Sequence, residues 1–78
     1  MEIEIKYPVC SDYFHTVRIE DHISLEEWEA MTQEEKNAFV KKLSDDLFWE
    51  AQRDVDGGYS IEYAYGWVDE NGEDQDFE

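Results

Sequence analysis

Most of the side chains in this sequence that could do chemistry are carboxylates. Its 78 residues contain 22 Asp and Glu against six Lys and Arg, which gives a formal net charge of −16. Carboxylates can transfer protons, hold Ca²⁺, or present a negative surface to a basic partner. Because acidic pairs occur throughout the sequence, no single pair indicates an acid–base site. The spacing of the acids and the elements that carry them must therefore decide between these kinds of chemistry.

Other catalytic groups are few. His15 alternates with Val17 and Ile19 on one side of a predicted strand, and His22 lies in a turn, so we interpret both as structural histidines. Cys10 is the single cysteine, and no motif places a base beside it. Glycine-rich phosphate loops are absent. These observations predict a protein that is not an enzyme and uses no cofactor.

The run 69-DENGEDQDFE-78 raises the question of a calcium site. An EF-hand loop needs oxygen ligands at positions 1, 3 and 5, glycine at position 6 and glutamate at position 12. Asp69 and Asn71 fit the first two places, but Gly72 already arrives at position 4. In 54-DVDGG-58 the glycine also comes too early, so no metal site is predicted. Residues 75–78 are expected to fray, and the acids before them to extend a negative surface.

Another group of acids is spaced along a predicted helix. Asp46, Glu50 and Asp54 are four residues apart, which on a helix places Cβ atoms about 5–6 Å from one another. This spacing is comparable to that of neighbouring phosphates on one nucleic-acid strand. Like charges so placed destabilise an isolated helix by a few tenths of a kcal/mol. The presence of an unfavourable row of acids therefore indicates a functional role for it. The candidate partner-binding residues are Glu26, Glu29, Glu34, Asp45, Asp46, Trp49, Glu50, Asp54, Asp69, Glu70, Glu73 and Asp74.

Two strands and a helical region are predicted to position these residues. Apolar and polar residues alternate in 2-EIEIKY-7 and in 13-YFHTVRIE-20, which indicates a hairpin of two half-buried strands. Ser24 with Glu27, and Thr32 with Glu35, have the spacing of capping boxes. They predict a short helix from residue 24 and a long helix over 32–54, ended by Gly57 and Gly58. The apolar stripe of the long helix is Phe39, Val40, Leu43, Leu47, Ala51 and Val55.

The segment 59-YSIEYAYGWV-68 is predicted to be the third strand, with Tyr59, Ile61, Tyr63, Tyr65 and Trp67 on one face. We interpret this aromatic face as core, and exposure of Tyr63 or Tyr65 would reverse that interpretation. The order β-β-α-β predicts one α+β domain over residues 1–78. Its mostly antiparallel three-stranded sheet is packed on one face by the long helix, which the short helix precedes.

A family resemblance rests on the helix entry formed by Trp28, Met31, Thr32, Glu34 and Glu35. With this entry, residues 27–63 resemble a class of small acidic proteins of unknown function encoded by tailed phages. The resemblance implies a phage or prophage source and a role against host enzymes or defences, of the anti-CRISPR kind. It implies no catalytic residue.

The charge and the aromatic content together predict the class of partner. A chain this acidic repels nucleic acid and anionic membrane directly, and no apolar run approaches the roughly 20 residues of a membrane span. With a single cysteine and no signal segment, a cytoplasmic protein is expected. Our leading hypothesis is a non-catalytic inhibitor that mimics nucleic acid and binds the basic cleft of a host nuclease or CRISPR effector.

Two alternatives stay open. In one, an accessory or regulatory phage protein contacts a basic partner protein through an aromatic-anchored acidic surface, without mimicry. Trp49 falls on the polar side of the long helix and would be the anchor, unless it packs under the short helix or the hairpin. In the other, the acids serve only solubility or adaptation to salt, but a chain with three Trp and five Tyr in 78 residues is unusual for that role.

Overall fold

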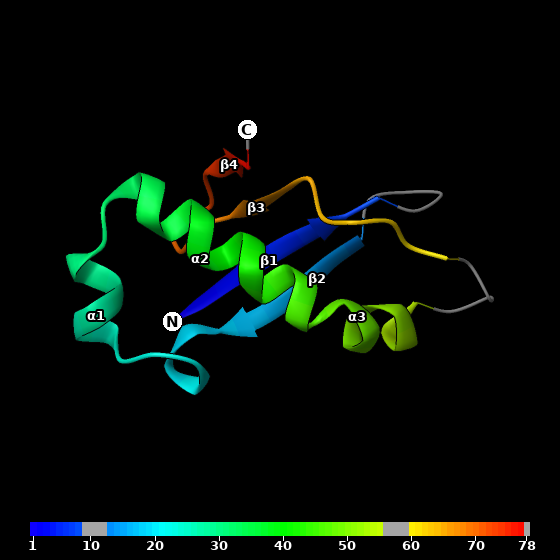
Figure 1. The fold of residues 1–78 in the computed structure, drawn as a ribbon, viewed down its shortest axis with the longest axis horizontal. Helices are drawn as coiled ribbons and strands as arrows, with labels where there is room; N and C mark the ends of the chain where they lie inside the picture. Colours follow the sequence, from blue (N-terminus) through cyan, green and yellow to red (C-terminus); the bar gives the residue numbers. More distant parts are fainter. Residues whose placement is uncertain (9–12, 56–59, 78) are drawn as a thin grey trace.

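The computed structural model describes residues 1–8, 13–55 and 60–77. The fold belongs to the α+β class, as predicted, and Figure 1 shows the course of the chain. No helix in these ranges is both long and apolar enough to cross a membrane. The elements are β1 (Glu2–Tyr7), β2 (Tyr13–Arg18), a 3₁₀ turn η1 (Ile19–Asp21), α1 (Leu25–Ala30), α2 (Gln33–Asp46), α3 (Phe48–Asp54), β3 (Gly66–Val68) and β4 (Asp74–Asp76).

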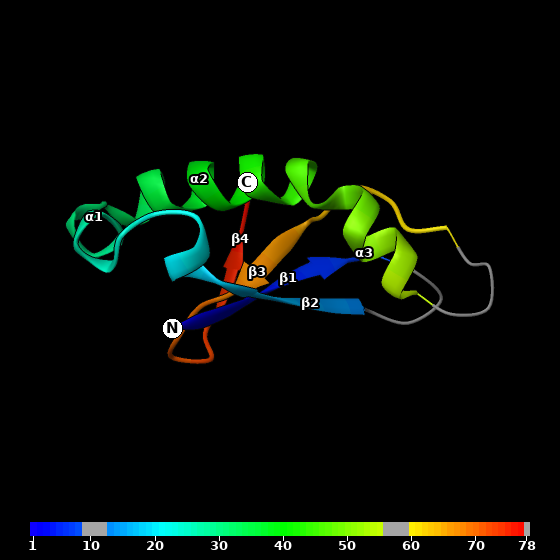
Figure 2. The same cartoon turned by 90° about the horizontal axis from the view of Figure 1, so that it is seen from below.

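The strands form one antiparallel sheet of four strands in the order β2-β1-β3-β4. The prediction of a three-stranded sheet is therefore wrong. The additional strand, β4, comes from the acidic C-terminal run, whose composition resembles that of a tail. Figure 2 shows α2 running over one face of this sheet, with α1 and α3 at its two ends.

The predicted hairpin is confirmed, with Ile3 opposite Val17 and Ile5 opposite His15. Strand β2 ends at Arg18, two residues early, because the 3₁₀ turn begins at Ile19. Extended by one residue, the β1–β2 register places Met1 opposite Ile19. The Ile19 N–H donates to the Met1 carbonyl at 3.0 Å, so these two opposite residues are joined by a backbone hydrogen bond. Hydrogen-bonded pairs alternate along an antiparallel ladder. The odd-numbered residues of β1 therefore bond to β2, and its even-numbered residues direct their backbone groups toward β3.

The single long helix predicted over 32–54 is instead two helices that meet at Leu47. The buried Tyr7 hydroxyl donates to the Ser44 carbonyl at 2.7 Å. In a continuous helix that carbonyl would accept from the N–H of Phe48. The break also lets Phe48 pack its ring edge-on against Tyr7, with 6.3 Å between ring centroids. The apolar stripe itself is confirmed, because Val40, Leu43 and Ala51 are buried and Phe39, Leu47 and Val55 are partly buried.

Both predicted helix starts are present. Thr32 and Glu35 form a complete capping box at α2. At α1, the Ser24 hydroxyl oxygen accepts from the Glu27 N–H at 3.2 Å. The Glu27 carboxylate, however, accepts from the Ser24 hydroxyl rather than from the Ser24 backbone. The box at α1 is thus half formed, and the helix is short.

The predicted strand over 59–68 is mostly not a strand, because only Gly66–Val68 pairs with β1. Pro8 is the next even-numbered position after Lys6, and it has no N–H to continue the ladder. The Glu62 N–H donates instead to the Pro8 carbonyl at 3.3 Å. The Tyr65 N–H still donates to the Lys6 carbonyl at 3.1 Å, but residues 60–64 leave the register that would have placed the Tyr63 ring in the core. Tyr59, Gly57 and Gly58 lie outside the described residues.

The fraying expected for residues 75–78 is contradicted at Gln75 and Asp76, which lie in β4. Phe77 is partly buried against the core, and residue 78 lies outside the described ranges. Gly66 permits this docking, because a Cβ there would lie 2.6 Å from the Gln75 carbonyl oxygen. Strand β4 is short, but its pairing beside Gly66 and the packing of Phe77 against the core hold it in place.

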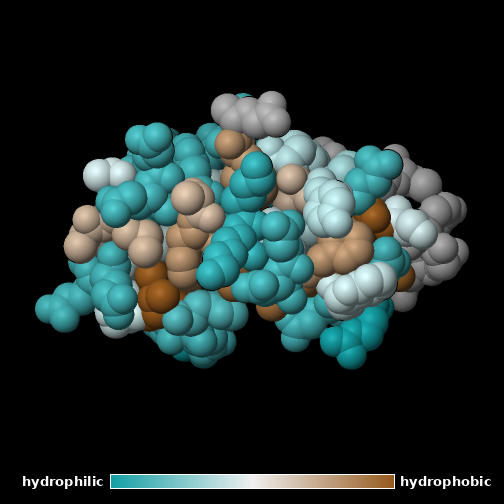
Figure 3. Space-filling view, viewed as in Figure 1, coloured by the Kyte–Doolittle hydropathy of each residue, from teal (hydrophilic) through white to brown (hydrophobic). Residues whose placement is uncertain are grey.

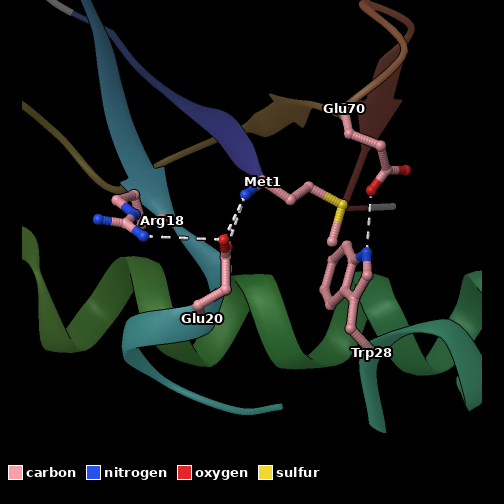
Figure 4. Close-up of polar contacts among 5 residues, drawn as sticks. All are labelled: Met1, Arg18, Glu20, Trp28 and Glu70. Carbon is pink, nitrogen blue, oxygen red and sulfur yellow. Dashed lines mark hydrogen bonds and ion pairs between the residues drawn. The ribbon is translucent and has the colours of Figure 1, made fainter. Parts of the chain in front are cut away.

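Two tryptophans join the helical layer to the sheet. Trp28 of α1 and Trp67 of β3 are buried and contact edge to face, with 5.8 Å between ring centroids. The Trp67 indole N–H donates to Asn37 of α2 at 3.0 Å, and that of Trp28 donates to Glu70 at 2.9 Å. Figure 4 shows the Trp28 indole directed at the Glu70 carboxylate. One aromatic cluster therefore fixes α1, α2, β3 and the turn before β4.

Candidate functional site

The acids predicted to contact a partner are spread over several parts of the molecule. Glu26 and Glu29 are exposed on α1, and Glu34 is exposed in the first turn of α2. Asp45 and Asp46 are exposed in the last turn of α2, more than two helical turns from Glu34. The predicted acids thus fall into two groups, one on α1 and the first turn of α2, and the other at the end of α2, next to α3.

The row of Asp46, Glu50 and Asp54 does not lie on one helix, because Leu47 separates Asp46 from the other two. Asp54 accepts from the Tyr13 hydroxyl at 3.2 Å and lies 3.5 Å from His15 Nδ1. The expected regular row of carboxylates on a single helix is therefore wrong. Asp46 lines a small groove with Lys42 and His22, whereas Glu50 lines another with Arg18 and His22.

Three of the four C-terminal acids have structural contacts. Glu70 accepts from the Trp28 indole, and Asp74 forms an ion pair with Lys6 at 3.1 Å. Asp69 accepts from the N–H groups of Asn71 and Glu73 at 2.9 and 3.0 Å. Glu73 is exposed. Of this predicted extension of the negative surface, most carboxylates hold the turn and β4 in place.

Glu20, in the 3₁₀ turn η1, lies beside two cationic groups. Glu20 accepts from the N-terminal ammonium at 2.7 and 2.6 Å through its two oxygens, and Arg18 lies 3.8 Å away (Figure 4). The hydrogen bond from the ammonium lowers the pKa of Glu20. This contact ties the start of β1 to the 3₁₀ turn.

Asp69 is predicted to make the turn before β4 sensitive to acid. Partial burial raises the pKa of Asp69, but hydrogen bonds from Glu73, Gln75 and Asn71 outweigh it and lower the pKa below its ordinary value of 3.8. Because the folded pKa is lowered, this stabilisation is present above about pH 4 and is lost as the pH falls through the folded pKa. We expect the destabilisation caused by Asp69→Asn to shrink between about pH 5 and pH 2, measured by urea unfolding of variant and wild type.

All other carboxylates are present in both proteins, so the difference between variant and wild type isolates the contribution of Asp69. A difference in unfolding free energy that stays constant over this pH range would contradict the prediction.

Two strongly exposed aromatic side chains lie where α2 meets α3. Trp49 is 72% exposed and Tyr63 is 74% exposed, although the face of residues 59–68 was interpreted as core. Phe48 lies between them, with ring centroids 5.4 Å from Trp49 and 5.5 Å from Tyr63. The exposure of Tyr63 and of Tyr65, which is 40% exposed, reverses the interpretation at these two positions, whereas Ile61 and Trp67 of the same predicted face are buried in the core. Trp49 does not pack under α1 or the hairpin.

These rings border an open groove of about 530 Å³, which we call the aromatic groove. It is lined by Lys41, Ser44, Asp45, Phe48, Trp49, Tyr63 and Ala64. A second hollow of about 480 Å³ shares two of these residues and is lined by Lys41, Ala64, Tyr65, Asp76 and Phe77. The shared residues make the two hollows neighbours along the side of α2. Figure 3 shows paler and brown residues over the α2–α3 junction, and tan and brown residues also gather at the other end of the same face, toward α1.

Sequence reasoning identified Trp49 and Asp45 but missed Phe48 and Tyr63. Phe48 directly follows the helix break, which depends on the distant Tyr7. The possible signal for Tyr63 was Pro8, because a proline opposite a predicted strand removes a ladder donor. The groove is therefore formed by contacts between residues distant in the sequence, which local sequence patterns do not predict.

Groups with catalytic or metal-binding potential form no second site in the described ranges. His15 is half-buried between the Tyr13 hydroxyl, at 3.3 Å, and Asp54, and these contacts fit a structural histidine. His22 is exposed. Among residues 1–8, 13–55 and 60–77, no group of three or more His, Cys, Asp or Glu is placed to hold a metal ion. Cys10 lies outside these ranges.

Comparisons of the chain with protein-family models, with curated protein sequences and with solved structures found no match.

Proposed function

We propose that this protein is a non-catalytic binding protein whose aromatic groove holds a basic partner protein. The observation that carries the proposal is the exposure of Trp49 and Tyr63, at 72% and 74%, around one groove. Large aromatic side chains left in water at adjoining positions are typical of interfaces, where Trp and Tyr dominate the binding energy. The fold offers these two rings no buried position of their own.

The electrostatics favour a partner that carries Lys and Arg. The formal net charge of −16 attracts a basic surface over distances of about a Debye length and raises the association rate. Asp45 places a carboxylate in the groove wall beside the rings, and no ion pair within the described ranges uses it. A cationic side chain can meet both groups there, the aromatic face and the carboxylate.

Nucleic-acid mimicry has less support. The row that suggested it is divided at Leu47, and its last member, Asp54, contacts Tyr13 and His15. A phage source and a host-defence target remain predictions from the family resemblance.

The proposal is tested by selecting a displayed library of random peptides on the protein. The expected result is enrichment of peptides that combine Lys or Arg with apolar residues, whose affinity falls as salt is added. Binding of a selected peptide is then measured by fluorescence anisotropy to wild type and to two multiple variants. One variant combines Trp49→Ala with Tyr63→Ala, and the other combines Asp46→Asn, Glu50→Gln and Asp54→Asn.

The proposal expects the aromatic double variant to lose most of the affinity and the charge triple variant to retain most of it. The opposite ranking, with a selected peptide that competes with DNA-like polyanions, would favour mimicry. Enrichment of peptides without basic residues would overturn the proposal.

A further inference from the structure

The aromatic groove and the second hollow beside it differ in the charges that line them. Helix α2 forms one wall of both, and the stretch that leads into β3 contributes to the other (Figure 1). Asp45 lines only the aromatic groove, together with Trp49 and Tyr63, whereas Lys41 lines both hollows. A ligand that lies along α2 therefore meets rings and a carboxylate toward α3, and then a lysine side chain one helical turn away.

Lys41 is exposed and has no ionic partner in the part of the chain that the structure describes. Neither Lys41 nor Asp45 takes part in an ion pair there, with each other or with another residue. Lysine four residues before an acid is also the less favourable order for such a pair on a helix. Asp76 lines the second hollow, but its Oδ1 lies 3.5 Å from the position that a Cβ on Gly66 would take, next to Lys6. The carboxylate of Asp76 is therefore directed toward Lys6.

The spacing of Lys41 and Asp45 matches that of alternate residues in an extended chain. The two positions lie on the same side of α2 and are about 6 Å apart along the helix axis. Alternate residues of an extended segment point to one side and are about 6.6 Å apart. Such a segment can thus bring one side chain to Asp45 and another, two positions away, to Lys41.

We propose that the groove binds an extended segment of the partner that carries Lys or Arg at one position and Asp or Glu two positions away. This inference rests on the proposed function and specifies the partner's sequence. The basic side chain meets Asp45 and the exposed rings, and the acidic side chain meets Lys41.

Charge complementarity selects this segment among the many basic ones that a net charge of −16 attracts. A segment with a second base at the position of the acid would meet the like charge of Lys41. An acid elsewhere on the segment would be repelled by the surrounding carboxylates, such as Glu62 beside Tyr63, which is exposed. Lys41 is therefore the residue that determines specificity, by favouring one pattern and disfavouring another.

The test selects a displayed library of random peptides on three proteins, the wild type, Lys41→Glu and Lys42→Glu. Peptides selected on the wild type should be enriched in Asp or Glu two positions from Lys or Arg. On Lys41→Glu this enrichment should be replaced by enrichment of a second base. Lys42→Glu makes the same change of charge at the next residue, which is exposed and lines a separate groove with His22 and Asp46. This control should select the wild-type pattern.

Fluorescence anisotropy then measures one selected peptide and a version in which its acid is replaced by Lys. The replacement should weaken binding to the wild type and to Lys42→Glu by about threefold or more. It should strengthen binding to Lys41→Glu.

Selected peptides that carry Lys or Arg without an acid two positions away would overturn this inference and leave the proposed function standing. Equal enrichment of the acid on Lys41→Glu and on the wild type would do the same. Enrichment of peptides without basic residues would instead overturn the proposed function, and this inference with it.

Discussion

Replacing Trp49 with alanine is expected to weaken binding of a basic partner by about 30-fold or more while leaving the fold unchanged. Central aromatic residues of interfaces commonly contribute at least about 2 kcal/mol on truncation, and about 1.4 kcal/mol corresponds to a tenfold change in affinity. Trp49 is 72% exposed and contacts Phe48 alone among the described aromatic rings. The unfolding free energy should therefore change by no more than about 0.5 kcal/mol.

The measurement is anisotropy of a peptide selected on the wild-type protein, alongside urea unfolding of the same samples. Phe14→Ala is the matched control, because Phe14 is an exposed aromatic on β2, outside the groove. Binding that falls equally for both variants would mean that the peptide recognises exposed aromatic residues in general. Binding that survives Trp49→Ala but is lost with added salt would assign recognition to the carboxylates alone.

Replacing Trp28 with alanine is expected to have the largest effect on stability, a loss of about 3–5 kcal/mol. Trp28 is 1% exposed and packs on Trp67 and Phe39. Its indole N–H also holds Glu70 at the turn before β4. A domain of 78 residues has a total stability of only about 4–12 kcal/mol. The variant should therefore be largely unfolded at temperatures where the wild type is folded.

Thermal and urea unfolding followed by far-UV circular dichroism would measure this loss. Leu25→Ala on the same helix is the control, because Leu25 is 39% exposed and its truncation should cost much less than that of Trp28. If both variants lose the same stability, the loss would come from α1 itself, and the inferred role of Trp28 in joining α1 to the sheet would be wrong.

The helix break at Leu47 leads to the exposure of the rings at the aromatic groove. The Tyr7 hydroxyl reaches Ser44 from the centre of the sheet, the helix ends within one turn, and Phe48 then turns toward Tyr7. Trp49, the next residue, is consequently placed at the rim of the groove beside Tyr63. The candidate site is therefore a product of packing between β1 and α2, and not of any motif within the helix.

The roles of individual acids could not be read from composition. Glu70 and Glu73 are equivalent in a count of charges, yet Glu70 binds the Trp28 indole and Glu73 is exposed. Asp54 and Asp46 likewise occupy one predicted row but have different neighbours. Which carboxylates remain available to a partner depends on donors that are distant in the sequence.

The sequence by itself determined the features that depend on neighbouring residues. Alternation predicted the hairpin, the apolar period predicted the buried stripe of the helices, and Thr32 with Glu35 predicted the start of α2. Each of these depends on side chains within a few positions, so the pattern and the cause lie in the same short segment.

Only the tertiary structure decided the number of strands, the break at Leu47 and the exposure of the aromatic rings. Strand β4 exists because Lys6 pairs with Asp74 and Gly66 leaves room for Gln75, while Pro8 withholds the donor that would have kept Tyr63 in the sheet. These contacts join residues far apart in the chain. Whether a Trp or an Asp faces water depends on what such distant segments bring to it, because burial and hydrogen bonding are set by neighbours in space.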